Sequence, residues 1–139
     1  GGGLAAGLGL WASQRPDVRI VGVESAESVA MSETIKAGHD VEITVGETIA
    51  DGITGNLEPG SVTVGLIKDH VHSLVRVTEA ELWHAIRYLV EYHGVIAEGA
   101  GAVAVAALLA GKVDVVGQPV AVISGRNIAL PTLAKVLAG

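Results

Sequence analysis

The sequence predicts a three-layer α/β fold in which an open, mainly parallel sheet carries helices on both faces. Two observations support this prediction. Short Val- and Ile-rich runs alternate with longer segments of helical periodicity, as in β-α-β units. Half of the 139 residues are hydrophobic and 17% are charged, which is sufficient for one buried core. Because no repeat or linker is visible, we expect one α/β domain over residues 1–139.

In the first part of the chain, glycine and polar side chains mark the ends of the predicted elements. A glycine run leads into an apolar helix at residues 4–11, and residues 18–24 form a buried strand after a polar turn. Ser28 can cap the next helix, which we expect to stop at Gly38. The alternation at residues 41–45 indicates a further strand.

The middle of the chain contains the clearest local signal. Residues 47–60 are punctuated by glycine and proline, so we expect an irregular, functional connection before a helix at 61–70 and a strand at 73–77. Thr78 and Glu81 form a capping box, in which each side chain can bind the other residue's free backbone amide.

The last predicted elements follow from periodicity and glycine stops. The helix opened by the capping box has apolar residues at three-to-four spacing and ends at Gly94. Residues 100–110 are small and apolar on all sides, which indicates a buried helix closed by Gly111. Residues 119–123 are predicted to be a second buried strand.

Charge and composition exclude several classes of partner. The net charge is -6 and the nine Lys and Arg residues are scattered singly, so we expect neither nucleic acid nor an acidic membrane surface as a partner. Glycine interrupts every apolar run before it could span a bilayer. The absence of cysteine excludes disulfides and thiolate chemistry, and it indicates a cytoplasmic setting.

Four segments at predicted strand or helix ends contain residues suited to ligand binding. Glycine amides before a helix can hold a phosphate, a carboxylate enters an apolar helix, and a hydroxyl leaves a predicted strand. Taken singly, each segment also fits a flexible terminus, a helix-start carboxylate or an ordinary turn. The four segments are Gly1–Leu4, Thr48–Gly52, Glu98–Gly101 and Ser124–Asn127.

In this order and spacing, the four segments resemble the C-terminal half of fold-type II pyridoxal-phosphate (PLP) enzymes, specifically the serine/threonine dehydratase and serine racemase group. The resemblance covers essentially the whole chain and includes the strand that ends at Glu24. It implies the C-terminal part of the tryptophan synthase beta-like fold, as a fragment of the large cofactor-binding domain without its upstream half. It also implies a lyase that removes water from L-threonine or L-serine and then deaminates the product to a 2-keto acid.

The resemblance implies a role for each matching residue. The glycine run corresponds to the loop that holds the cofactor phosphate, Glu98 to a carboxylate beside the ring, and Ser124 to the partner of the pyridine nitrogen. A hydroxyl carries no charge that would keep this nitrogen protonated. Asp51 corresponds to the substrate side. The implied cofactor-binding residues are Gly1, Gly2, Gly3, Leu4, Gly52, Glu98, Ser124 and Asn127.

The sequence departs from the group in three ways. The group's metal site uses the glutamate matched by Glu24 and an aspartate where Ala30 stands, so we predict that this site is lost or weak. Gly99 replaces a common proline. The Schiff-base lysine segment is not in this chain, and we expect the isolated chain to be inactive. We expect all four lysines on the surface: Lys36, Lys68, Lys112 and Lys135.

Two other interpretations remain open. The start of the chain fits G-x-G-x-x-A with Glu24 about 20 residues later, as in an NAD(P)-binding Rossmann-like half-domain. That interpretation leaves Glu98 and Ser124 without a role. The third interpretation is a non-catalytic truncated or split half that only folds or associates. Within the resembled group, dehydratase and racemase activities are both compatible with the sequence, and we expect a homo-oligomer for the full-length enzyme.

Overall fold

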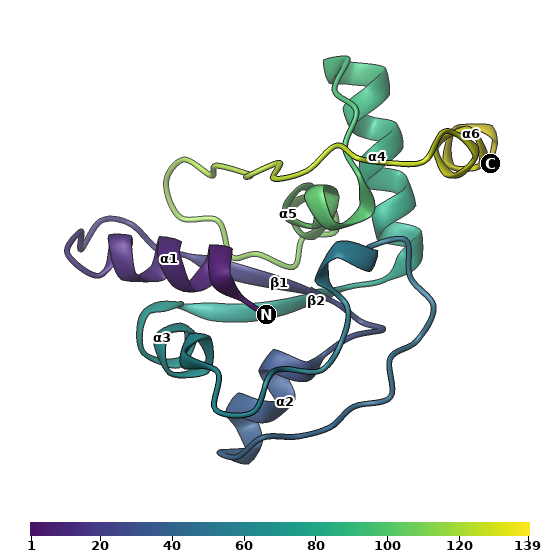
Figure 1. The fold of residues 1–139 in the computed structure, drawn as a ribbon. Helices are drawn as coiled ribbons and strands as arrows, with labels where there is room; N and C mark the ends of the chain where they lie inside the picture. Colours follow the sequence, from purple (N-terminus) through teal and green to yellow (C-terminus); the bar gives the residue numbers. More distant parts are fainter.

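A pair of parallel strands, β1 (Val21–Ser25) and β2 (Ser73–Val77), lies at the centre of the protein (Figure 1). The computed structural model describes residues 1–139. The strands pair from Val21 with Ser73 to Ser25 with Val77. Around them lie α1 (Gly3–Ala12), α2 (Ala30–Ala37), the short 3-10 helix η1 (Asp51–Ile53), α3 (Val62–His70), α4 (Glu79–His93), α5 (Gly99–Leu109) and α6 (Leu130–Ala138).

Helices cover both faces of the sheet, which confirms the predicted three-layer α/β arrangement. Successive side chains of a strand point to opposite faces. Accordingly, Leu74 of β2 packs with the cluster formed by α1, α2 and α3, whereas Val75 and Val77 belong to the core formed with α4 and α5. In Figure 1, α3 and α5 lie on opposite sides of the strands.

The larger core lies between α4 and α5. Leu82, Ile86 and Leu89 of α4 are buried at helical spacing against the small residues of α5. Because α5 is built mainly of Gly, Ala and Val, the two helices can pack closely. No helix of the protein combines the length and the apolar composition that crossing a membrane would require.

The capping box at the start of α4 is confirmed. The Glu81 backbone amide donates to the Thr78 hydroxyl at 3.4 Å, and the Glu81 carboxylate accepts the Thr78 backbone amide at 2.7 Å. At the other end of α4, Gly94 has a φ of 63°, a left-handed conformation that favours glycine. Local sequence signals therefore predicted both ends of this helix correctly.

Two predicted strands are wrong. Residues 41–45 are irregular, because the Asn56 side chain takes the place of a partner strand: its Oδ1 accepts the Ile43 amide at 2.7 Å and its amide donates to the Ile43 carbonyl. Residues 119–123 pair with no strand of the chain, and their predicted burial is also wrong, since Val120 is 83% exposed. A strand needs a paired neighbour, which an apolar run cannot guarantee.

Two helix starts also differ from the prediction. α2 begins at Ala30, and Ser28 does not cap it; the Ser28 hydroxyl instead accepts the Gly55 amide at 3.1 Å. The free amides of α2 donate to Glu24, which reaches them from the end of β1. α6 was not predicted, although a proline in its first turn is a known helix-start signal.

Candidate functional site

The start of α5 is the point at which separate candidate segments meet. Glu98 precedes the helix, but its carboxylate does not cap α5. Instead, Glu98 Oε2 accepts the Asn127 amide at 2.8 Å, and the Glu98 amide donates to the Gly125 carbonyl at 3.2 Å. These two hydrogen bonds hold the segment 124–127 against the start of α5. Glu98 therefore differs from an ordinary helix-start carboxylate, whose side chain would cap its own helix.

Three glycines make this meeting point possible. A Cβ at Gly101 would collide with the backbone of Gly125, whose nitrogen would lie 2.8 Å away. A Cβ at Gly99 would collide in the same way with the Ile49 carbonyl. At Gly125, a Cβ would fall 2.7 Å from the carboxyl carbon of Glu98. The first turn of α5 therefore touches two loops through their backbones, because side chains are absent there.

The segment 48–52 is held from its other side by hydrogen bonds. The Thr48 hydroxyl donates to Glu79 Oε1, and the Ile49 amide donates to Glu79 Oε2 at 3.0 Å. Thr48 Oγ1 also accepts the Ala50 amide at 3.1 Å and the hydroxyl of the fully buried Ser25 at 3.3 Å. Glu79 and the end of β1 thus fix the loop that leads into η1.

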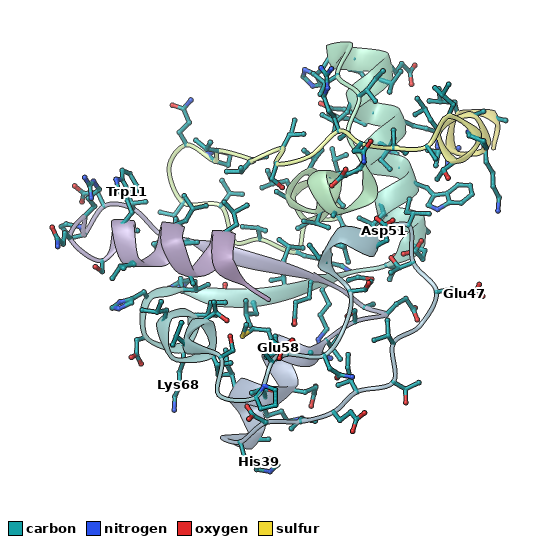
Figure 2. All side chains as sticks on the ribbon, in the orientation of Figure 1. Trp11, His39, Glu47, Asp51, Glu58 and Lys68 are labelled. Carbon is teal, nitrogen blue, oxygen red and sulfur yellow. The ribbon has the colours of Figure 1, made fainter.

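η1 brings two predicted site residues to this region. Asp51 and Gly52 begin η1, and both are exposed. A Cβ at Gly52 would lie 3.1 Å from the Ala100 Cβ and 3.6 Å from Glu98 Oε1. Gly52, Glu98 and the backbone of Asn127 therefore lie together. Figure 2 labels Asp51 on this side of the sheet, beside the start of α4.

Ser124 lies in an open position next to this group. It directly precedes Gly125, its side chain is exposed, and its hydroxyl makes no hydrogen bond to another protein atom. A hydroxyl with one proton and two lone pairs can donate to or accept from a ligand. Ser124 is consequently available for a polar ligand atom.

The glycine run forms a second, separate part of the candidate site. Gly2 precedes α1 with a φ of 77°, and no side chain caps the helix. The amides of Gly2, Gly3 and Leu4 donate to no protein acceptor, and a Cβ at Gly3 would meet no atom within 4 Å. Leu4 is 56% exposed. Free amides beside open space at a helix start suit an anion.

No hydrogen bond joins the glycine run to the Glu98 region. Their relative orientation is nevertheless consistent with a common ligand. α1 runs in the direction opposite to β1, so its first turn points toward the end of the sheet at which the strands finish (Figure 1). Open α/β sheets bind ligands at this end.

Glu24 has a structural role in the protein. Its Oε1 accepts the amides of Met31 and Ser32 at 3.0 and 3.2 Å, which satisfies the first turn of α2. Its Oε2 is buried and has no protein partner. An acid that binds a ribose must offer its oxygens to the ligand, so this arrangement does not favour the dinucleotide interpretation. The predicted loss of the metal site at Glu24 and Ala30 stays a prediction.

No lysine forms a hydrogen bond or ion pair with Glu98, Asn127 or the glycine run. Lys36, Lys68 and Lys135 are exposed, as predicted, and Figure 2 shows Lys68 pointing away from the protein. Lys112 is partly buried, contrary to the prediction, because its ammonium donates to Glu81 Oε2 and to the Arg76 carbonyl. That the Schiff-base lysine lies outside this chain stays a prediction.

Glu79 was not predicted as a site residue, yet it anchors the loop of Thr48. Thr48, Gly101 and Gly125 lie within the predicted candidate segments, but their roles in the loop network and in the close backbone approach were not predicted. A glycine inside an apolar helix costs stability, which is a signal that could have singled out Gly101. Nothing in the sequence pairs Glu79 with Thr48, because 31 positions separate them.

The sequence of this chain is similar to those of known proteins. The family model described as "Pyridoxal-phosphate dependent enzyme" matches residues 1–125. The L-threonine ammonia-lyase of Thermotoga maritima is 40% identical over 99% of this chain and 34% of its own length. The catabolic L-threonine dehydratase of Escherichia coli is 35% identical over 98% of this chain and 42% of its own length. The chain thus spans less than half of the length of these relatives.

Solved structures of similar proteins share the fold. Processed threonine deaminase isoform 2 from Solanum lycopersicum superposes with a TM-score of 0.85 at 31% identity, over 99% of this chain and 42% of the other. Maize serine racemase also gives a TM-score of 0.85, at 26% identity, over 99% of this chain and 44% of the other.

Proposed function

This chain belongs to the pyridoxal-phosphate dependent enzyme family, and from that premise we propose that it is part of an ammonia-lyase that uses PLP to dehydrate and deaminate L-threonine or L-serine. The observation that carries the proposal is the meeting of three segments at the start of α5. Glu98 holds the segment of Ser124 and Asn127 while Gly52 lies beside its other oxygen. These are the residues that the family resemblance assigns to the cofactor and its surroundings.

The residues of the chain fit the proposed cofactor. The uncapped amides at the start of α1 suit the phosphate, because Gly3 leaves open space beside the backbone for an anion. The unpaired hydroxyl of Ser124 suits a ring nitrogen. The chain therefore contains hydrogen-bonding partners for the phosphate and for the ring nitrogen of PLP.

When bound, PLP supplies an electron-withdrawing system that stabilises negative charge at the substrate Cα. Ser124 would hydrogen-bond the ring nitrogen through a neutral hydroxyl, which does not hold a proton on that nitrogen as a carboxylate would. Glu98 has its Oε2 engaged by the Asn127 amide, so only Oε1 remains to face the ring. Asp51 is exposed at the proposed substrate side, where its carboxylate could accept a hydrogen bond from the substrate ammonium or hydroxyl group.

The proposal extends to the whole protein. We place the lysine that binds PLP covalently outside these 139 residues, since no lysine of this chain forms a hydrogen bond or ion pair with Glu98, Asn127 or the glycine run. We assign residues 1–139 to a single α/β unit of the large cofactor-binding domain. Homo-oligomer formation and a cytoplasmic location belong to the same proposal, and the catabolic dehydratase relative supports a role in amino-acid breakdown.

The test uses the intact protein that contains this segment. Titration with PLP should produce a saturable change in visible absorbance, and NAD should produce no saturable change in fluorescence. L-threonine should then yield 2-ketobutyrate, or L-serine pyruvate, together with ammonia. Formation of the D-amino acid without keto acid would instead indicate a racemase. Saturable NAD binding without PLP binding would overturn the proposal.

A further inference from the structure

The glycine run is tied to α3 by a short chain of hydroxyl groups. Thr63 lies in the first turn of α3, and its hydroxyl donates to the Gly1 carbonyl oxygen at 2.6 Å. The hydroxyls of Ser61 and Thr63 lie 2.8 Å apart. Since a hydroxyl has one proton and Thr63 gives its proton to Gly1, Ser61 must donate to Thr63. The donor and the acceptor of both hydrogen bonds are therefore determined, and the second bond ends on the glycine run.

This bond determines which way the first peptide group faces. The peptide between Gly1 and Gly2 is trans, so its carbonyl and its N–H point in opposite directions. Because Thr63 holds the carbonyl on the α3 side, the Gly2 N–H must point to the other side of the loop. That N–H has no protein acceptor.

Packing closes the α3 side of the loop to a ligand. A Cβ at Gly2 would lie 2.7 Å from both Ile67 Cδ1 of α3 and Met31 Cε of α2. Ile67 and Met31 are buried with Ala6 in the smaller core. A Cβ at Gly3, in contrast, would meet nothing within 4 Å. The open side of the loop is therefore the side to which the Gly2 N–H is turned.

We propose that Thr63 is a positioning residue for the cofactor phosphate: by holding the Gly1 carbonyl, it turns the Gly2 amide toward the anion. The inference rests on the proposed function, because the anion is taken to be the phosphate of PLP. Thr63 itself would not touch the cofactor. If the Thr63 hydroxyl is removed, the peptide group between Gly1 and Gly2 can flip and present its carbonyl oxygen to the anion. A carbonyl oxygen repels a phosphate instead of donating a hydrogen bond to it.

The experiment compares ligands with and without the phosphate. In the intact protein freed of cofactor, Thr63→Val removes the hydroxyl at nearly constant volume, and Thr63→Ser retains it. Ser13→Ala is the matched control, since it removes a hydroxyl-to-carbonyl bond at the opposite end of α1. The dissociation constants of PLP and of pyridoxal, which lacks the phosphate, are measured for each variant.

Thr63→Val should weaken PLP binding about tenfold, as expected for one lost hydrogen bond that orients a donor. Pyridoxal binding should stay unchanged, and Thr63→Ser and Ser13→Ala should both keep the wild-type preference for PLP over pyridoxal. An equal loss for both ligands would show a general loosening of the site and overturn the inference, as would an unchanged preference. If the wild-type protein does not bind PLP at all, the proposed function itself is wrong. The failure of the proposed function can thus be told apart from the failure of the inference about Thr63, in which the wild-type protein still binds PLP.

Discussion

Gly101 of α5 lies directly against the backbone of Gly125, so closely that a Cβ on Gly101 would stand 2.8 Å from the Gly125 nitrogen and collide with its carbonyl oxygen. Gly125 follows Ser124, the proposed partner of the cofactor ring. The helix therefore positions this loop through backbone contact, and the loop cannot move away without losing the bonds between Glu98 and the segment 125–127.

Gly101→Ala should destabilise the protein and displace the loop of Ser124. The added methyl meets backbone atoms that no rotamer change can move, so we expect a loss of about 1–3 kcal/mol in the free energy of unfolding. Gly7→Ala is the control, because Gly7 is an exposed helical glycine with open space around it. The free energy of unfolding of Gly7→Ala should rise by about 0.5–1 kcal/mol. Urea unfolding measures this quantity for both variants, and equal changes would contradict the close contact between Gly101 and Gly125.

Ser124→Ala should weaken PLP binding to the intact protein. The change removes one neutral hydrogen bond, worth about 0.5–1.5 kcal/mol, and should raise the dissociation constant by up to about tenfold. Ser73→Ala is the control and should leave the dissociation constant unchanged, since Ser73 is an exposed serine at the start of β2. Absorbance titration with PLP measures the difference. Identical constants for Ser124→Ala and wild type would mean that Ser124 is only a loop residue.

Glu79→Ala should loosen the segment 48–52. Glu79 accepts both the Thr48 hydroxyl and the Ile49 amide, and the loss of a part-buried hydrogen bond of about 1–1.5 kcal/mol corresponds to roughly tenfold faster exchange of the Ile49 amide hydrogen. Glu91→Ala is the control, since Glu91 is an exposed residue of the same helix without a side-chain partner. Hydrogen exchange followed by mass spectrometry or NMR measures the rate, and unchanged protection in Glu79→Ala would refute the anchoring role.

Stability at acidic pH should depend on Glu81. Burial raises the pKa of this carboxyl, but hydrogen bonds from Lys112 and the Thr78 amide outweigh it and hold the pKa below its ordinary value of 4.5. A lowered pKa in the folded state means that the ionised group stabilises the protein above the unfolded value and that this contribution is lost as pH falls through the folded value. The contribution of Glu81 to stability is therefore lost over a pH range that begins near 4.5 and extends to lower pH.

Glu81→Gln isolates this charge. The free energy of unfolding of wild type should exceed that of the variant by about 1 kcal/mol or less at neutral pH, because the pair is partly exposed. The difference should shrink as pH falls below 4.5. Glu58→Gln, which changes an exposed carboxyl without a partner, is the control and should give no such trend. A difference between wild type and Glu81→Gln that stays constant with pH would exclude the linkage.

The sequence by itself determined the features that depend on neighbouring residues. The capping box of Thr78 and Glu81, the glycine stop at Gly94 and the buried helix α5 follow from hydrogen bonds and periodicity within a few positions. The four candidate segments were recognisable for the same reason, since each is a short local motif.

Only the tertiary structure decided how these motifs combine. Residues 41–45 and 119–123 have the composition of strands but no partner, and pairing is a property of two segments. Likewise, the bond from Thr63 to Gly1 spans 62 positions and that from Asn127 to Glu98 spans 29. No local pattern encodes such distances, because the packing of helices on both faces of the sheet brings these atoms together.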